Sequence, residues 1–251
     1  MRAALAIGLL LVARAAAAQD QFEIQVYDAE TAGPGESGME THLNFFALGT
    51  TGASAAGEAP NQHVTHVTFE PHVGLAWWCE AGAYFQTAFR ADGTFDYAGV
   101  KLRYKARLKR RWHNRIGLAL NLEFSSVPRR FEATGAAMEL RPIIDFRFKR
   151  IYAAFNPILS VDFAGAAQGR PQLEPALALE VALVGPLSAG AEYYGAFGPL
   201  DHFGAEQSHR IFGVADLVFK RWALQVGAGY GLAGPERVIA KAIVSIDFTG
   251  R

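Results

Sequence analysis

Four positively charged side chains recur at every second position within one short stretch of the chain. They are Lys101, Arg103, Lys105 and Arg107. Successive side chains of a β-strand point to opposite faces, so in a strand these four would form a single row of positive charge. We therefore expect this stretch to supply the basic wall of a polar surface.

Charged residues of other stretches also keep to one face of a two-residue alternation. Together with the basic row, the residues that we expect to line this polar surface are Lys101, Arg103, Lys105, Arg107, Glu123, Arg141, Asp145, Arg147, Glu174, Glu180, Glu192 and Asp216. A basic wall opposite acids such as Glu174 and Glu180 would create a transverse field that can orient a polar or zwitterionic solute. The alternative is that the charges pair across the interior and brace a largely closed structure.

Signals for catalysis, metal binding and nucleic-acid binding are weaker. Four histidines have the side chain of a metal ligand, but their sequence positions leave the geometry undetermined, and we interpret them as water-facing; they are His42, His63, His66 and His72. Ser208 and His209 are adjacent only in a loop, without the third group that nucleophilic catalysis needs. The 24 basic and 24 acidic residues balance, so no overall charge steers the chain toward nucleic acid. We predict no enzyme activity, metal or cofactor.

The elements that must carry the polar surface are β-strands. In the last of them, apolar residues share one parity and polar residues the other: Val238, Ala240, Ala242, Val244, Ile246 and Phe248 against Lys241, Ser245 and Asp247. About a dozen segments of this kind, each of roughly ten residues, follow one another between residues 39 and 248. This repetition predicts an all-β protein built from antiparallel strands.

The apolar face of these strands is expected to meet lipid. About twelve strands enclose an interior too wide for side chains to fill, so an apolar interior would be a void. All four tryptophans fall at short connections, several of them basic, as at a headgroup boundary; they are Trp77, Trp78, Trp112 and Trp222. The sequence therefore predicts an antiparallel transmembrane β-barrel of about 12 strands with a polar lumen. A secreted soluble β-protein is the alternative.

Three segments are expected along the chain. Residues 1–18 have the charged start, apolar stretch and small-residue site of a signal peptide. Residues 19–38 are predicted to be an N-terminal periplasmic segment, either a plug or a short strand, and residues 39–251 the barrel. Short and long connections are expected to alternate strictly, with short turns in the periplasm and long loops outside the cell.

Three stretches of the mature chain, residues 22–31, 38–45 and 64–74, carry a resemblance to known proteins. They are similar to uncharacterised proteobacterial outer-membrane barrels and to the porins of the meta-pathway of phenol degradation. The resemblance implies a bacterial outer-membrane location and a transporter-like role, without a substrate.

Two functions remain open from the sequence. The first is a channel or transporter-like pore in the outer membrane, with lipids and small polar or amphipathic solutes as its partners and no nucleic acid. The second is a structural or surface-interaction barrel with a closed lumen. Its long loops would then carry the function.

Overall fold

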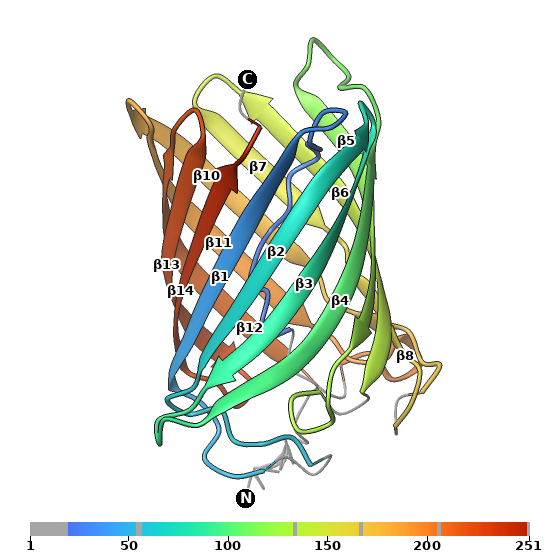
Figure 1. Ribbon diagram of the computed structural model, residues 1–251, viewed down its shortest axis with the longest axis vertical. Coiled ribbons are helices and arrows are strands. Elements are labelled where there is room, and N and C mark those ends of the chain that lie inside the picture. Colours follow the sequence, from blue (N-terminus) through green and yellow to red (C-terminus); the bar gives the residue numbers. More distant parts are fainter. Residues whose placement is uncertain (1–19, 54–56, 133–134, 166–167, 205–206, 250–251) are drawn as a thin grey trace, which may run out of the picture.

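The computed structural model of the protein describes residues 20–53, 57–132, 135–165, 168–204 and 207–249, which form a closed antiparallel barrel of 12 strands (Figure 1). Neighbouring strands pair in order around the barrel, and β1 pairs with β14 to close it. This confirms the predicted fold class. The strand segments are β1 (Ser37–Leu48), β2 (Thr65–Ala76), β3 (Cys79–Phe89), β4 (Phe95–Arg107), β5 (Ile116–Ser126), β6 (Ala136–Phe148), β7 (Ile151–Asn156), β8 (Leu159–Asp162), β9 (Gln172–Leu173), β10 (Ala176–Val184), β11 (Leu187–Ala196), β12 (Ser208–Val218), β13 (Trp222–Ala233) and β14 (Val238–Asp247).

Two of the twelve strands are interrupted by proline. Both β7 and β8 pair with β6, while β7 pairs with β10 and β8 with β9. Pro157 follows β7, and Pro175 separates β9 from β10. Proline has no backbone N–H to donate to a sheet, so each one breaks a strand without ending its path through the wall.

The outer face of the barrel is apolar, as the alternation predicted. Residues such as Phe69, Leu102 and Phe124 are exposed on it, and the four tryptophans are exposed near the connections at one end. An apolar band with aromatic residues at its border fits a lipid bilayer. Within the described ranges, no helix has the length and hydropathy needed to cross a membrane.

The connections differ from the predicted strict alternation of short and long. The connection over residues 108–115 belongs to the short-turn end, yet it is longer than the connection over 90–94 at the opposite, long-loop end. Arg111 bridges to Ile116, and three residues between them, Trp112, His113 and Asn114, have positive φ angles. The connection therefore folds on itself as a small hairpin tip, which takes more residues than a tight turn.

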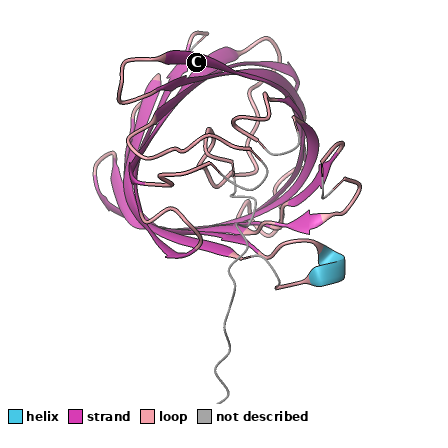
Figure 2. Ribbon diagram, turned by 90° about the horizontal axis from the view of Figure 1, so that it is seen from below, coloured by secondary structure: helices cyan, strands magenta, loops and turns pink. Residues whose placement is uncertain are grey.

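Residues 20–36 lie inside the barrel and belong to none of its strands; Figure 2 shows this chain crossing the ring. We call residues 20–36 the luminal segment. Of the two predicted alternatives for residues 19–38, this placement corresponds to a plug rather than to a short strand. The strand β1 begins at Ser37, two residues before the predicted boundary, and the predicted signal peptide lies outside the described residues.

The lumen is not uniformly polar, which corrects part of the prediction. Ile24 of the luminal segment packs with inward-facing wall residues that include Phe46, Phe212 and Ile239. Phe22 and Tyr27 belong to two further buried apolar clusters. These wall residues are apolar because they pack against a segment inside the barrel, so the lumen has small cores of its own.

Candidate functional site: the luminal segment and the charged lumen

The backbone of the luminal segment is hydrogen-bonded by side chains of the wall. Asn156 binds both the N–H and the C=O of Tyr27, at 2.7 and 3.0 Å, and Asp145 accepts from the N–H of Ala29 at 2.8 Å. On the other wall, Thr68 donates to the Phe22 carbonyl at 3.1 Å and Lys241 to the Ile24 carbonyl at 3.0 Å. Buried backbone groups need such partners, and here side chains replace the ladder that a strand would form. Most of the segment is therefore held in place without joining the sheet. Its last residues do pair with the wall: Gly35 donates to the Gly74 carbonyl, and Gly74 donates to the Glu36 carbonyl, both at 2.9 Å.

Acids of the luminal segment pair with the predicted basic row in the same order along both chains. Asp20 binds Lys101, Asp28 lies 3.6 Å from Lys105, and Glu30 binds Arg107. Two arginines of β6 pair with the same segment: Arg141 lies 3.3 Å from Glu23, and Arg147 lies 2.8 Å from Asp28. The charges of the basic wall are thus largely balanced by the segment that lies against it.

Arg103, in the middle of the basic row, binds carboxylates of the wall instead. Its Nη2 atom lies 3.0 Å from Glu70 Oε1 and 2.9 Å from Glu80 Oε1. The second oxygen of Glu80 accepts a hydrogen bond from the N–H of Ala32 at 2.6 Å. Arg103 is therefore also linked to the luminal segment, through one shared carboxylate.

Two of the predicted acids on this side also have partners in the structure. Glu123 accepts hydrogen bonds from Tyr84 and Asn121 at 3.2 and 2.7 Å, and lies 3.7 Å from Lys101. Asp145 forms a two-pronged pair with Arg110 at 2.7 and 2.8 Å. Arg110 lies in a connection, so the period-two pattern of the strands gave no indication of its role.

The opposite wall, formed by β10 to β14, has a different environment. Glu192 binds Lys241 and accepts from Tyr194 at 2.8 Å, and Asp216 accepts from Gln225 at 2.9 Å. Glu180 and Asp216 line a cavity of about 870 Å³ that opens toward the short-turn end. The luminal segment forms the other side of this cavity, so these two predicted acids face space rather than the segment.

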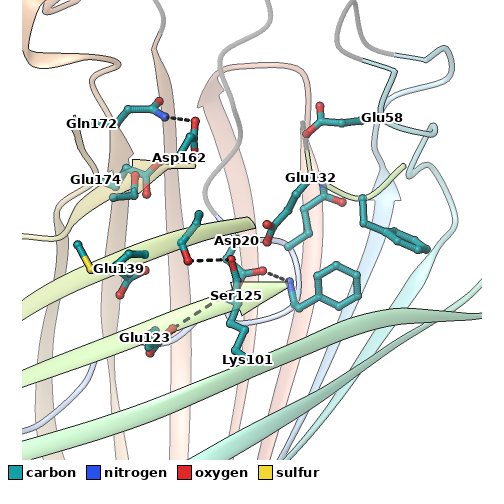
Figure 3. Close-up of a pocket in the computed structure, with 16 residues that line it drawn as sticks. Asp20, Glu58, Lys101, Glu123, Ser125, Glu132, Glu139, Asp162, Gln172 and Glu174 are labelled. Atoms are coloured by element: carbon teal, nitrogen blue, oxygen red, sulfur yellow. Dashed lines mark hydrogen bonds and ion pairs between the residues drawn. The ribbon is translucent and has the colours of Figure 1, made fainter. Parts of the chain in front are cut away.

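A second cavity, of about 100 Å³, lies at the long-loop end, and we call it the outer cavity (Figure 3). Its carboxylates come from the segment, the loops and the strands; they are Asp20, Glu58, Glu123, Glu132, Glu139, Asp162 and Glu174. Lys101 is the one basic side chain among its described lining residues. Burial, reinforced by Asp20, raises the pKa of the loop residue Glu132 to about 7, although Lys101 opposes the shift. The described residues that line this cavity thus include seven acids and one base.

The predicted site residues are thus divided between three environments. Those on β4 and β6 lie against the luminal segment, Glu174 lies at the outer cavity, and Glu180 and Asp216 lie at the larger cavity. Members of the basic row share cavities with the predicted acids: Lys101 lines the outer cavity with Glu174, and Arg103 and Lys105 line the larger cavity with Glu180. The row is not an open wall, however, because the luminal segment binds Lys101 and lies 3.6 Å from Lys105.

Two histidines correct the prediction of water-facing side chains. His66 is buried and stacks on Phe22 with ring centroids 4.4 Å apart. His42 is completely buried, and its Nε2 atom lies 3.2 Å from Glu70 Oε2. Both are covered because the luminal segment removes the water that an open lumen would hold.

Sequence reasoning missed the acids of the luminal segment as partners of the wall. A signal was present: Asp20, Glu23, Asp28 and Glu30 occur within one short stretch. Large apolar residues on the otherwise polar parity, such as Phe46 and Ile239, were a second signal. Together they indicate that a partly apolar, acidic segment packs inside.

Comparisons with known proteins support the fold. No family model and no curated protein matches the sequence, so the resemblance to the meta-pathway porins has no support at the sequence level. Among solved structures, the chain is similar to the COG4313 outer membrane channel from Pseudomonas putida F1, with a TM-score of 0.63 and 12% identity over 90% of this chain and 100% of that one. It is also similar to the KdgM porin, with a TM-score of 0.59 and 6% identity over 84% of this chain and 99% of that one. The protein thus has the barrel fold of outer-membrane channels.

Proposed function

We propose that the protein is a bacterial outer-membrane channel for small solutes, exported by a signal peptide over residues 1–18, in which the luminal segment limits passage. The observation that carries this proposal is the attachment of residues 20–36, which cross a closed barrel mainly on side-chain contacts, with backbone hydrogen bonds to the wall at Gly74 beside the start of β1. Ion pairs and side-chain hydrogen bonds can be exchanged for water one at a time, whereas a paired strand would have to leave a sheet. The cavities at the two ends supply the space on either side of the segment.

The charges suggest which solutes pass while the segment is in place. The basic row is matched by Asp20, Asp28 and Glu30. The outer cavity is lined by acids and one base, Lys101, whereas the larger cavity is mixed, with a small excess of acids over bases among its described lining residues. An excess of fixed charge of one sign enriches ions of the opposite sign. We therefore expect a preference for cations and for solutes with a positively charged group, instead of selection by the basic row.

The test is conductance in a planar bilayer, comparing the mature chain with a variant that lacks residues 20–36. A heat-modifiable shift on gels first verifies that each barrel is folded. The mature chain should give small, cation-preferring steps. The deletion should give steps several-fold larger with a shift toward anions, because it uncovers the basic row. Folded barrels that give no steps in either form would contradict the channel.

A structural barrel with a closed lumen is the second candidate, and one observation favours it. Arg103, Glu70 and Glu80 form a nearly buried ion-pair network that also holds the luminal segment. Such a network could serve only to brace the wall. In that case the deletion variant would lose stability and remain non-conducting.

A further inference from the structure

Three potential metal-ligand side chains converge on the lumen side of β1 and β2. They are Glu40, His42 and Glu70, and one ligand atom from each lies within 4.8 Å of the others. His42 Nε2 lies 3.2 Å from Glu70 Oε2 and 3.9 Å from Glu40 Oε2. Imidazole nitrogen with carboxylate oxygen is a donor set that zinc and similar divalent ions bind. Ligand atoms around one zinc lie roughly 3.4 Å apart, so small movements of the two carboxylates would complete the geometry.

The charge balance around this cluster requires more positive charge than the neighbouring side chains provide. Glu40, Glu70 and Glu80 lie together, and the guanidinium of Arg103 is shared by Glu70 and Glu80. Three carboxylates and one guanidinium leave two negative charges. The Glu70 side chain is fully buried and that of Glu40 is 23% exposed. Buried charge without a counter-charge is costly, and one divalent cation would supply the two missing positive charges.

A fourth donor comes from the luminal segment. The side-chain amide of Gln25 donates to Glu40 Oε2 at 3.0 Å. Its Oε1 atom is buried and accepts no hydrogen bond from any residue that the structure describes. A half-turn of this amide would direct Oε1 toward the cluster as an oxygen ligand. Both Glu40 and Gln25 line the cavity of about 870 Å³, which gives an ion a route from the short-turn end.

We propose that Glu40, His42 and Glu70, with Gln25 as a fourth donor, form a binding site for a divalent transition-metal ion of the zinc type. His42 binds through Nε2, and the carboxylates bind through one oxygen each. The bound ion joins two wall strands to the luminal segment. The competing explanation of the same cluster is a hydrogen bond between His42 Nε2 and Glu70 Oε2, which needs no metal.

The test is titration of tag-free, chelator-treated, folded protein with Zn²⁺, followed by calorimetry and by metal analysis after gel filtration. We expect one Zn²⁺ per chain. Glu40→Gln and His42→Gln should each weaken binding at least tenfold, whereas His63→Gln, which changes an exposed loop histidine, should bind as the parent does. Glu40→Gln matters most, because this partly exposed side chain is the one whose change is least able to prevent folding.

Binding should also raise the unfolding temperature of the parent, since an ion that binds only the folded state stabilises it. This shift should be absent in folded Glu40→Gln. No uptake of Zn²⁺ by the folded parent would overturn the site and favour the hydrogen bond between His42 and Glu70. Uptake that is unchanged in both ligand variants would also overturn it. Neither result depends on whether the barrel conducts.

Discussion

The two halves of the lumen have the same strand pattern but different surroundings. On the side of β4 to β6, charged wall residues lie against the luminal segment, and Lys101, Lys105 and Arg141 find acids on it. On the side of β10 to β13, Glu180 and Asp216 face a cavity. The inward-facing charged residues of this barrel therefore have different surroundings in the two halves. The first half uses most of its charges to hold the segment, although Arg103 and Lys105 also line the larger cavity. In the second half, Glu192 is paired with Lys241, whereas Glu180 and Asp216 form no ion pair with a described residue.

The strongest way to test this contrast is to remove one charge from each half. Arg103→Gln leaves Glu70 and Glu80 buried without their cation, and breaking a buried pair in this way costs about 3–5 kcal/mol of unfolding free energy. Glu180→Gln should change that free energy by less than about 0.5 kcal/mol, because Glu180 is partly exposed at the larger cavity. Urea unfolding followed by tryptophan fluorescence measures both. Equal losses would show that the two halves do not differ.

A smaller effect is expected at Gly74, where the luminal segment lies directly against the wall. A Cβ atom on Gly74 would overlap the carbonyl oxygen of Gly33, so Gly74→Ala must push that end of the segment away. We expect a loss of about 1–3 kcal/mol and faster cleavage of the segment by added protease.

Gly213→Ala is the matched control for this change. A Cβ atom there meets nothing within 4 Å among the described residues, so stability and cleavage should match those of the parent. If Gly74→Ala also left cleavage unchanged, the close contact between Gly74 and Gly33 would not be what protects this end of the luminal segment from protease.

The smallest expected effect concerns ion preference on the side of β10 to β13. Replacing Glu180 by Gln together with Asp216 by Asn removes two negative charges from the larger cavity. The cation-to-anion permeability ratio, measured from reversal potentials, should fall by about twofold, because fixed charges enrich their counter-ions locally. Asp92→Asn, which changes an exposed loop acid, should leave the ratio unchanged. An unchanged ratio in the double variant would place ion selection elsewhere.

Much of the barrel could be predicted from the sequence because a strand repeats its environment every two residues. In β14, burial follows the alternation from Val238 to Val244, with Ile239, Lys241 and Ile243 buried on the inner face. The predicted directions of Lys101, Glu180 and Asp216 follow from the same period. The contacts of these residues could not be predicted, since each depends on a chain that approaches from far away in the sequence.

The amino-acid sequence by itself determined the all-β class, the approximate strand number, and which parity of each strand meets lipid and which meets the interior. These are local properties, set by side-chain alternation and by the length that a strand needs to cross a bilayer. Only the tertiary structure decided that residues 20–36 fill part of the lumen, that Asp28 lies beside Lys105, and that His42 is buried next to Glu70. These outcomes depend on closing the barrel around the segment. Closure brings together charges that are far apart in the chain and removes the water that would otherwise separate them.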